Sequence, residues 1–408
     1  MSNIIIYLPN EPLGKQGGME KATHQLACLL RDSGHNVSLL CQQKNRLNVP
    51  YRPPVPLIFI PQKLNKKEKR NFINDLIRQK QTELIIDQTE GGIIGKYGIF
   101  KNRKQIQSNK IKFVAVQHSS QYTYLKYYRF IKKKHFENSF SGRLKNFIYN
   151  NIYLNIKRLR ACILQKKLFR DLTLNYDRII TLSSGGIGEF QKIYSKTPSC
   201  KLAAIPNVIP DLAQNTPPCQ KECRCLFVGR LDNAAKGIDR LLRIWKIFEE
   251  KLPGWHLDIV GNGQDAGMLK EMAHKLNLKN ISFEGFQEPE PYYARSSLFC
   301  LTSTFEGFGL VLAEAMQHGC VPLAFDSYPA ARDIILPGKT GELIQPFNEQ
   351  EYANKLISLA ANPDDLGILA ENAREHIKAR YQSNGMFSYK TYEAQRAISR
   401  SIGLTIID

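Results

Sequence analysis

The sequence predicts an α/β protein made of two domains, each a parallel β-sheet covered by helices on both faces. Short apolar runs alternate with longer, mostly polar helical stretches along the chain, which is typical of parallel sheets. The length of 408 residues allows each of two domains to bury a core of its own. Residues 211–223 contain Pro217-Pro218, and we predict that they form the linker between the domains.

Apolar runs and turn residues divide the first half of the chain. Residues 19–33 have a helical pattern that Gly34 ends. Gly17 and Gly18 precede this helix, and glycines at a helix N terminus leave backbone N–H groups free for a phosphate. His118 ends the fifth run, at the edge where open α/β sheets bind ligands. The expected strands are Asn3–Leu8, Val37–Cys41, Leu57–Ile60, Leu84–Ile86 and Lys112–His118.

The net charge of +20 is concentrated in one region. Residues 62–170 contain 26 Lys and Arg but only 6 Asp and Glu, whereas the two kinds balance elsewhere. Within this region, aromatic side chains alternate with basic ones between residues 121 and 140. This composition suits an anionic membrane surface or a nucleic acid, and packing of the aromatics under a loop is the alternative. The basic residues concerned are Lys126, Arg129, Lys132, Lys133 and Lys134.

An apolar stripe at helical spacing follows the aromatic segment. Its members recur at steps of four, four, three and four residues, with lysines and arginines around them. We expect part of the stripe to face the core, because a helix must cover the sheet. The stripe consists of Ile148, Ile152, Ile156, Leu159 and Ile163.

Composition also limits the compartment. No apolar segment approaches the ~20 residues of a transmembrane helix, and the N terminus lacks a basic segment ahead of its apolar run, so a cytoplasmic protein is expected. The nine cysteines are an odd number and are scattered, as in reduced proteins. Only Cys219, Cys223 and Cys225 cluster, and their spacing matches no zinc pattern, so ordinary linker and strand cysteines are favoured over a metal site.

The second half is organised around the segment from Ser303 to Met316. An apolar strand, Ser297–Thr302, leads into the turn Glu306-Gly307-Phe308-Gly309, and a helix resumes at Leu310. A glycine turn at a helix start offers free N–H groups and the positive end of the helix dipole, which favour phosphate. Glu306 in the turn can accept hydrogen bonds from hydroxyl groups, and Glu314 lies farther along the helix, within reach of a ribose.

Three further strand ends carry polar or glycine residues. Arg230 and Lys236 follow one strand and can reach one diphosphate, arginine as a planar fork and lysine as a point charge. Gly261 and Gly263 follow the next strand and permit a close backbone approach. Phe286 follows the third and offers an apolar surface for a base.

These motifs together resemble a known family. Glu306 and Glu314, with Gly-Phe-Gly between them and Ala-Met after them, are similar to the Glu-x7-Glu signature of family 4 retaining glycosyltransferases of the GT-B fold, the group 1 glycosyl transferases. Phe227-Val-Gly-Arg-Leu231 with Lys236-Gly237, Val260-Gly-Asn-Gly263 and Phe283-Glu-Gly-Phe286 resemble the family's other motifs in order and spacing. The resemblance covers residues 224–381 and is thin over the first half.

The resemblance implies a GT-B architecture, two Rossmann-like parallel-sheet domains facing across a cleft. It implies an acceptor-side domain at residues 1–208, a donor-binding domain at 209–385, and a C-terminal helix within 386–408 that packs back on the first domain. The run Ser327-Tyr-Pro-Ala-Ala-Arg-Asp333 departs from the glycine-rich turn that the family commonly shows, which makes the donor less predictable.

The resemblance also implies roles for single residues. Glu306 and His118 would be catalytic, and both would contact the donor sugar together with Gly307 and Phe308. The diphosphate would lie at Arg230, Lys236, Gly309 and Leu310, with the Gly17-Gly18 loop opposite. The nucleoside would lie at Glu314, Gly261, Gly263 and Phe286.

The implied reaction transfers a hexose from a nucleotide-sugar, a UDP-sugar first, to a saccharide acceptor with retention at the anomeric carbon. No protein nucleophile is identifiable, so the resemblance implies front-face attack by the acceptor. No Asp-x-Asp tripeptide occurs, so we expect no metal and no cofactor, the charge of the leaving diphosphate being met by Arg230, Lys236 and helix-start amides.

We expect the acceptor to be a lipid-linked saccharide or a lipopolysaccharide or capsule precursor, at the inner face of the cytoplasmic membrane. Its recognition surface would include Lys126, Arg129 and Lys132-Lys133-Lys134. Two rival hypotheses are a basic nucleic-acid-binding protein and a non-catalytic GT-B scaffold. The balanced charge of the second half argues against nucleic acid, and the complete set of Arg230, Lys236, Glu306 and Glu314 argues against the scaffold.

Overall fold

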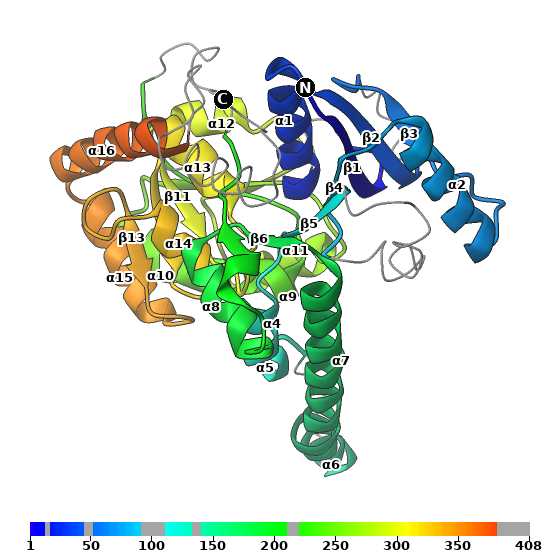
Figure 1. The fold of residues 1–408 in the computed structure, drawn as a ribbon. Coiled ribbons are helices and arrows are strands. Elements are labelled where there is room, and N and C mark those ends of the chain that lie inside the picture. The colour runs from blue at the N-terminus through cyan, green and yellow to red at the C-terminus, as the bar shows by residue number, and fades with distance from the viewer. Residues whose placement is uncertain (13–16, 45–51, 91–110, 133–139, 210–219, 382–408) are drawn as a thin grey trace. The chain divides into compact units, whose positions relative to one another are not determined.

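The computed structural model describes residues 1–12, 17–44, 52–90, 111–132, 140–209 and 220–381 (Figure 1). The chain divides into two compact units. The first comprises Met1–His118 and Ile163–Ile209, and the second comprises the described parts of Ser119–Cys162 and Pro210–Asn384.

The first unit contains a parallel sheet of seven described strands in the order β3-β2-β1-β4-β5-β6-β7. The interior strand β1 is buried on both faces from Ile4 to Leu8, as its unbroken apolar run predicts. All five strands expected in this part of the sequence are present. The strands are β1 Asn3–Asn10, β2 Asn36–Gln43, β3 Leu57–Phe59, β4 Leu84–Asp87, β5 Lys112–Gln117, β6 Arg178–Thr181 and β7 Leu202–Ala204.

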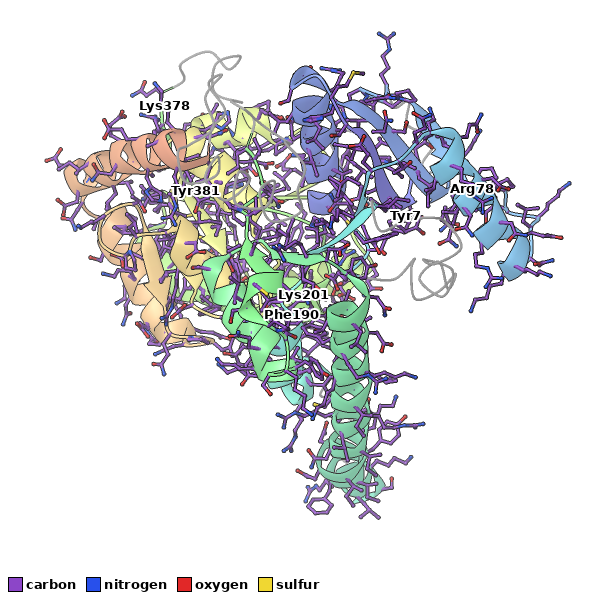
Figure 2. All side chains as sticks on the ribbon, in the orientation of Figure 1. Tyr7, Arg78, Phe190, Lys201, Lys378 and Tyr381 are labelled. Atoms are coloured by element: carbon purple, nitrogen blue, oxygen red, sulfur yellow. The ribbon has the colours of Figure 1, made fainter. Side chains whose placement is uncertain are left out.

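Helices pack on both faces of this sheet. The main core lies on the face covered by α2 (Lys66–Gln79), the C-terminal part of α7 (Leu154–Asn175) and α8 (Ser184–Ile193). Asn65 and Glu68 form a reciprocal capping box that fixes the start of α2. Tyr7 of β1 and Phe190 of α8, both labelled in Figure 2, belong to this core. Lys201, at the end of the short 3₁₀ helix η3 (Ser199–Lys201), donates to Thr173 O and Tyr176 O at 2.7 and 2.9 Å and so satisfies the last turn of α7.

The opposite face is covered in part by α1 (Gly18–Asp32). An apolar cavity of about 120 Å³ lies between α1 and the sheet. Of the described helices, only α1 contributes to its wall. The remaining wall comes from β4, β5 and β6, the residues directly after these strands and the segment 205–208, and His118 and Gln88 are among its polar members. Its apolar lining includes Leu26, Leu29, Leu84, Ile86, Val114, Val116, Ile180 and Leu182.

The second unit contains a parallel sheet of six described strands in the order β10-β9-β8-β11-β12-β13. Its strands are β8 Glu222–Val228, β9 His256–Val260, β10 Ile281–Gly285, β11 Ser296–Leu301, β12 Val321–Phe325 and β13 Glu342–Ile344. Its helices in this part of the chain are α9 Asn233–Lys236, α10 Ile238–Lys251, α11 Ala266–Lys275, α12 Glu290–Arg295, α13 Leu310–Gln317, α14 Pro329–Ile334, α15 Glu349–Ala360 and α16 Pro363–Tyr381.

A single boundary at residue 208 would place residues 119–162 in the first domain. In the structure these residues group with the second unit instead. They form α4 (Gln121–Lys126), α5 (Tyr128–Lys132), α6 (Phe140–Phe147), a π-helical stretch η2 (Ile148–Tyr153) and the start of α7. The physical reason is packing, because aromatic side chains of α4 and α5 contact Phe305 and Phe347 of the second unit. The expected C-terminal helix within 386–408 lies outside the described residues and stays a prediction.

The expectation that part of the apolar stripe faces the core is wrong for its members. Ile148, Ile152, Ile156, Leu159 and Ile163 are 46–62% exposed. The same helical stretch is buried instead through Leu154, Phe169 and Leu172. Figure 2 shows side chains standing out along the N-terminal part of α7.

Candidate active site

The segment that follows β11 is held by hydrogen bonds from both sides. Thr302 Oγ1 donates to Gly237 O at 2.9 Å, and Thr304 N donates to Ala235 O at 2.7 Å. Ser327 Oγ donates to Ser303 O at 2.8 Å. These bonds attach the segment to α9 and to the end of β12, so the strand end is a rigid base for the turn that follows.

Glu306 and Lys236 meet in this base. Lys236 Nζ lies 2.5 Å from Glu306 Oε1, and Ser303 Oγ donates to the same carboxylate oxygen at 2.6 Å. The two charged side chains are only 17% and 13% exposed. The structure therefore brings together the two predicted residues that lie 70 positions apart in the sequence.

The helix α13 begins directly after the turn. Gly309 precedes it with φ 89°, a left-handed conformation that favours glycine, and no described side chain caps the helix N terminus. The backbone N–H groups at Gly309 and Leu310 thus lie at an uncapped helix N terminus, and their contact with a diphosphate stays a prediction. Tyr328 lies behind them, its ring buried and its hydroxyl without a partner among the described residues.

Glu314 is buried, at 4% exposure. Its Oε2 accepts a hydrogen bond from the Tyr293 hydroxyl at 3.0 Å, and burial beside this carboxylate raises the pKa of Tyr293 well above its usual value. The predicted contact of Glu314 with a ribose stays a prediction. In the described conformation Tyr293, which the sequence reasoning missed, fixes the position of the carboxylate.

Arg230 and Lys236 differ in environment although both follow β8. The Arg230 side chain is 71% exposed and pairs with Asp232 at 3.2 Å. Lys236 is the last residue of α9, whose start is capped by the Asp232 side chain. Arg230 is thus largely exposed to solvent, whereas Lys236 is held against Glu306.

Gly261 and Gly263 serve chain packing. A Cβ atom at Gly261 would lie 1.9 Å from Gly229 O, and one at Gly263 would lie 2.4 Å from Leu231 O. The space beside these glycines, which we expected a ligand to approach, is therefore occupied by the neighbouring backbone. Leu231 N also donates to Asn262 O at 3.0 Å, which locks the two strand ends together.

The two phenylalanines of the predicted donor site also differ. Phe286 is 57% exposed, so its ring is available as a surface. Phe308 is buried against Tyr381, with ring centroids 5.7 Å apart, so its side chain supports the turn from inside the unit and is not free to contact a sugar.

His118 and the Gly17-Gly18 loop belong to the first unit. His118 Nε2 forms a short hydrogen bond with Gln88 Oε1, and burial lowers the pKa of the imidazole to about 4, so the ring is neutral near pH 7. Gly17 has φ 79°, and a Cβ atom there would meet the Glu20 carboxylate. The start of α1 thus already faces an acidic side chain in this conformation.

The predicted acceptor surface is described only in part. Lys126, Arg129 and Lys132 are exposed, whereas Lys133 and Lys134 lie outside the described residues. Arg129 Nη2 donates to Asn150 O and Asn151 Oδ1 at 3.2 Å, which joins α5 to η2. Tyr124, Tyr127 and Phe130 pack on Phe305 and Phe347 within the second unit, as the packing alternative expects, although Phe130 remains 49% exposed.

Sequence reasoning missed Arg240. Its side chain is 4% exposed, and its Nη2 donates to Thr302 O at 2.9 Å and to Thr304 Oγ1 at 2.7 Å. The available signal was an arginine among the apolar residues of α10, where a buried face is expected.

Two features of the described residues concern metal binding and membrane spanning. Among them, no group of three or more His, Cys, Asp or Glu side chains is arranged to hold a metal ion. Cys225 is buried in the core, Cys223 is exposed, and Cys219 lies outside the described residues. None of the helices in the described part of the chain is both long and apolar enough to cross a membrane.

Comparison with known proteins agrees with the geometry. Residues 210–376 match the family model described as glycosyl transferases group 1. An uncharacterised glycosyltransferase of Haemophilus influenzae is 32% identical over 46% of this chain and 53% of its own length. The lipopolysaccharide 1,6-galactosyltransferase of Salmonella typhimurium is 29% identical over 32% of this chain and 38% of its own length. The chain thus spans about half or less of these relatives.

A solved structure extends the likeness to the whole fold. A mutant of TarM from S. aureus, in complex with fondaparinux, alpha-GlcNAc-glycerol and UDP, matches 98% of this chain and 100% of its own with a TM-score of 0.71 at 14% identity. At that identity the match concerns the fold. The predicted fold class, GT-B, is confirmed, and the predicted resemblance to the group 1 glycosyl transferases is confirmed over residues 210–376.

Proposed function

We propose that this protein is a retaining, metal-independent glycosyltransferase that moves a hexose from a nucleotide-sugar, with a UDP-sugar favoured, to a saccharide acceptor. The observation that carries the proposal is the Lys236–Glu306 pair beside the uncapped N terminus of α13. A cation, free amides and a carboxylate at one strand end match the needs of a sugar diphosphate, which has charged phosphates beside neutral hydroxyls.

Each group has a defined task in this proposal. Lys236, Arg230 and the amides at Gly309 and Leu310 receive the charge that develops on the departing diphosphate. Glu306 accepts hydrogen bonds from sugar hydroxyls and orients the anomeric carbon, and its charge favours an oxocarbenium-like state. His118 is neutral near pH 7 and can therefore donate or accept a hydrogen bond at the sugar without carrying charge.

The relatives support the choice of substrates. One acts on lipopolysaccharide by its name, and the solved TarM complex contains UDP and alpha-GlcNAc-glycerol. We therefore propose a UDP-hexose as donor and a lipid-linked saccharide, or a lipopolysaccharide or capsule precursor, as acceptor.

The decisive experiment offers the purified protein a panel of nucleotide-sugars and measures release of the nucleoside diphosphate. We expect one UDP-hexose to give turnover and Glu306→Gln to lower kcat/KM by roughly 10²- to 10³-fold, the usual effect of removing one transition-state contact. Glu250→Gln on the exposed face of α10 is the matched control and should behave like the wild type. Turnover of wild-type size in folded Glu306→Gln would refute the proposed site.

We further propose that the protein works at the inner face of the cytoplasmic membrane, and that α6, η2 and the start of α7 form the contact. Large apolar side chains stand exposed along this stretch, and residues 140–162 contain five basic and no acidic residues. An apolar stripe with basic neighbours suits an anionic bilayer, where each basic residue contributes about 1 kcal/mol. A second copy of the chain would bring like charges together. The exposed apolar side chains are Leu144, Phe147, Ile148, Ile152, Ile156 and Leu159.

Flotation with vesicles of anionic and neutral lipid separates the contributions. We expect the wild type to float with anionic vesicles, the triple variant Ile152→Ser, Ile156→Ser, Leu159→Ser to float weakly, and Lys132→Glu, Lys133→Glu, Lys134→Glu to lose part of the binding. Ile368→Ser, a similarly exposed apolar residue on α16, is the control. If the wild type stays unbound at low salt, or the stripe variant floats equally well, a soluble acceptor becomes the better hypothesis.

A further inference from the structure

The helices α4 and α5 follow β5 of the first unit in sequence but pack on the donor side of the second. The Tyr124 ring meets Phe305, the residue before Glu306, edge-on at 5.5 Å. Tyr127 and Phe130 contact the Phe347 ring at 4.8 and 4.6 Å, the second pair stacked within 8° of parallel. In addition, α5 packs against α9, the helix that ends at Lys236.

Arg240 connects this aromatic group to the donor site. Its guanidinium carbon lies 4.9 Å from the Phe347 ring centroid and 5.3 Å from that of Phe130. Its Nη2 holds Thr302 O and Thr304 Oγ1, the two residues that flank Ser303. A buried guanidinium is costly unless its surroundings compensate, and aromatic faces supply part of that compensation.

Two backbone conformations adapt to this arrangement. Gly237 has φ 61°, and a Cβ atom there would lie 1.9 Å from Arg240 Nη2, so the glycine leaves room for the guanidinium. Phe347 has φ 66°, an uncommon conformation for a bulky side chain that persists only where the surroundings hold it. The aromatic group therefore carries a local cost, which points to a requirement for this geometry.

We propose that α4 and α5 hold the Lys236–Glu306 pair in position. Phe130 acts through Arg240 on Thr302 and Thr304, and Tyr124 acts through Phe305 on the residue next to it, Glu306. A segment encoded in the first half of the sequence thus completes the donor site of the second half. The role of the Lys236–Glu306 pair in donor binding rests on the proposed function. The ordering of residues 302–309 by α4 and α5 does not depend on it.

Amide hydrogen exchange tests the ordering directly. In Phe130→Ala and Tyr124→Ala we expect peptides that cover residues 302–309 to exchange roughly tenfold faster, with peptides from β8 and β12 unchanged. Tyr124→Phe keeps the ring and should restore wild-type exchange. Ile368→Ala removes a similar exposed apolar side chain elsewhere on the unit and should leave residues 302–309 unaffected.

Binding of UDP, measured by calorimetry, gives the second readout. We expect Phe130→Ala to weaken UDP binding on the order of tenfold while the melting temperature stays near that of Ile368→Ala, because small misplacements of a binding group are costly. Phe130→Leu, which keeps apolar volume without the ring, replaces Phe130→Ala if the latter does not fold.

The two readouts separate this inference from the proposed function. Wild-type exchange at residues 302–309 in both folded ring variants would overturn the positioning role, and so would exchange that rises equally across the whole unit. If the wild type binds no UDP, the proposed function fails, and faster exchange confined to residues 302–309 still supports the positioning role.

Discussion

Lys236 and Glu306 pair at 2.5 Å, so a diphosphate that binds Lys236 competes with this carboxylate for the charge of the ammonium group. The exposed Arg230 has no such competitor of equal proximity, since its partner Asp232 lies at 3.2 Å. The two cations should therefore differ in their contribution to binding, because a half-buried charge is less screened than an exposed one.

We predict that Lys236→Met weakens UDP binding by about 1.5–3 kcal/mol, the range for hydrogen bonds to charged groups. Arg230→Met should cost less, about 1 kcal/mol or below. Titration calorimetry of both variants with UDP measures the difference. An effect of Arg230→Met equal to or larger than that of Lys236→Met would show that the Lys236–Glu306 pair is not the phosphate site.

The lowered pKa of His118 predicts how the stability of the protein depends on pH. Its pKa of about 4 in the folded protein lies below the value near 6.5 expected in the unfolded chain. The unfolded chain therefore binds a proton first as pH falls, and stability is lost between about pH 6.5 and pH 4. Linkage gives a loss of about 2 kcal/mol between pH 7.5 and pH 5 from this residue.

Urea unfolding of wild type and His118→Gln at these two pH values measures that loss. The variant should lose about 2 kcal/mol less than the wild type on acidification, whatever its stability at pH 7.5. Other histidines contribute equally to both proteins and cancel. Parallel losses in the two proteins would contradict the lowered pKa.

Single residues also show the limit of sequence reasoning. Glu306, Lys236 and Gly309 could be assigned to one site, because each follows a strand and parallel strands end at one edge. The burial of Phe308 and the bond between Tyr293 and Glu314 could not, because they depend on which helix face meets which neighbour. The positions of strands and turns were predictable from local pattern, and side-chain partners from distant segments were not.

Among the elements, α1 and the strands beside it leave an apolar space between them. Leu29 of α1 and Val116 of β5 line a cavity of about 120 Å³, with apolar side chains on every strand around it. Protein interiors seldom retain such a space unfilled. The predicted C-terminal helix within 386–408 is the segment that we expect to cover this face.

We predict that deletion of residues 386–408 lowers the free energy of unfolding by about 3 kcal/mol or more, equivalent to one or two large side chains left exposed. Deletion of residues 403–408 alone is the control and should have little effect. Urea unfolding of the three proteins decides the matter. Equal stability of the long deletion and the wild type would place the C-terminal segment elsewhere.

The α4–α7 region shows why an element can be predicted and its location missed. The stripe from Ile148 to Ile163 has the spacing of a buried helix face, yet its members are exposed. Spacing reports that one face is apolar and cannot report what covers it. The same limit applies to Tyr124 and Phe130, whose aromatic partners Phe305 and Phe347 lie more than 150 residues away in sequence.

For the molecule as a whole, we expect salt to affect vesicle binding and turnover differently. The 62–170 region carries the net charge, so vesicle binding should fall steeply between about 0.05 and 0.5 M salt, as charges beyond a Debye length become screened. Turnover with a soluble acceptor should change little, and EDTA should leave it intact. A requirement for added divalent metal would show that charge on the diphosphate is met differently.

The packing around Gly261 and Gly263 limits how this sequence can change during evolution. Their Cβ positions are filled by the backbone at Gly229 and Leu231, so the folded unit itself demands glycine at both. A descendant that lost the proposed transfer activity would still have to keep these glycines in order to fold. Substitutions at Lys236 and Glu306 would carry no such penalty from the main chain. Drift after loss of activity would therefore erase the charged pair first and leave the glycine pattern standing.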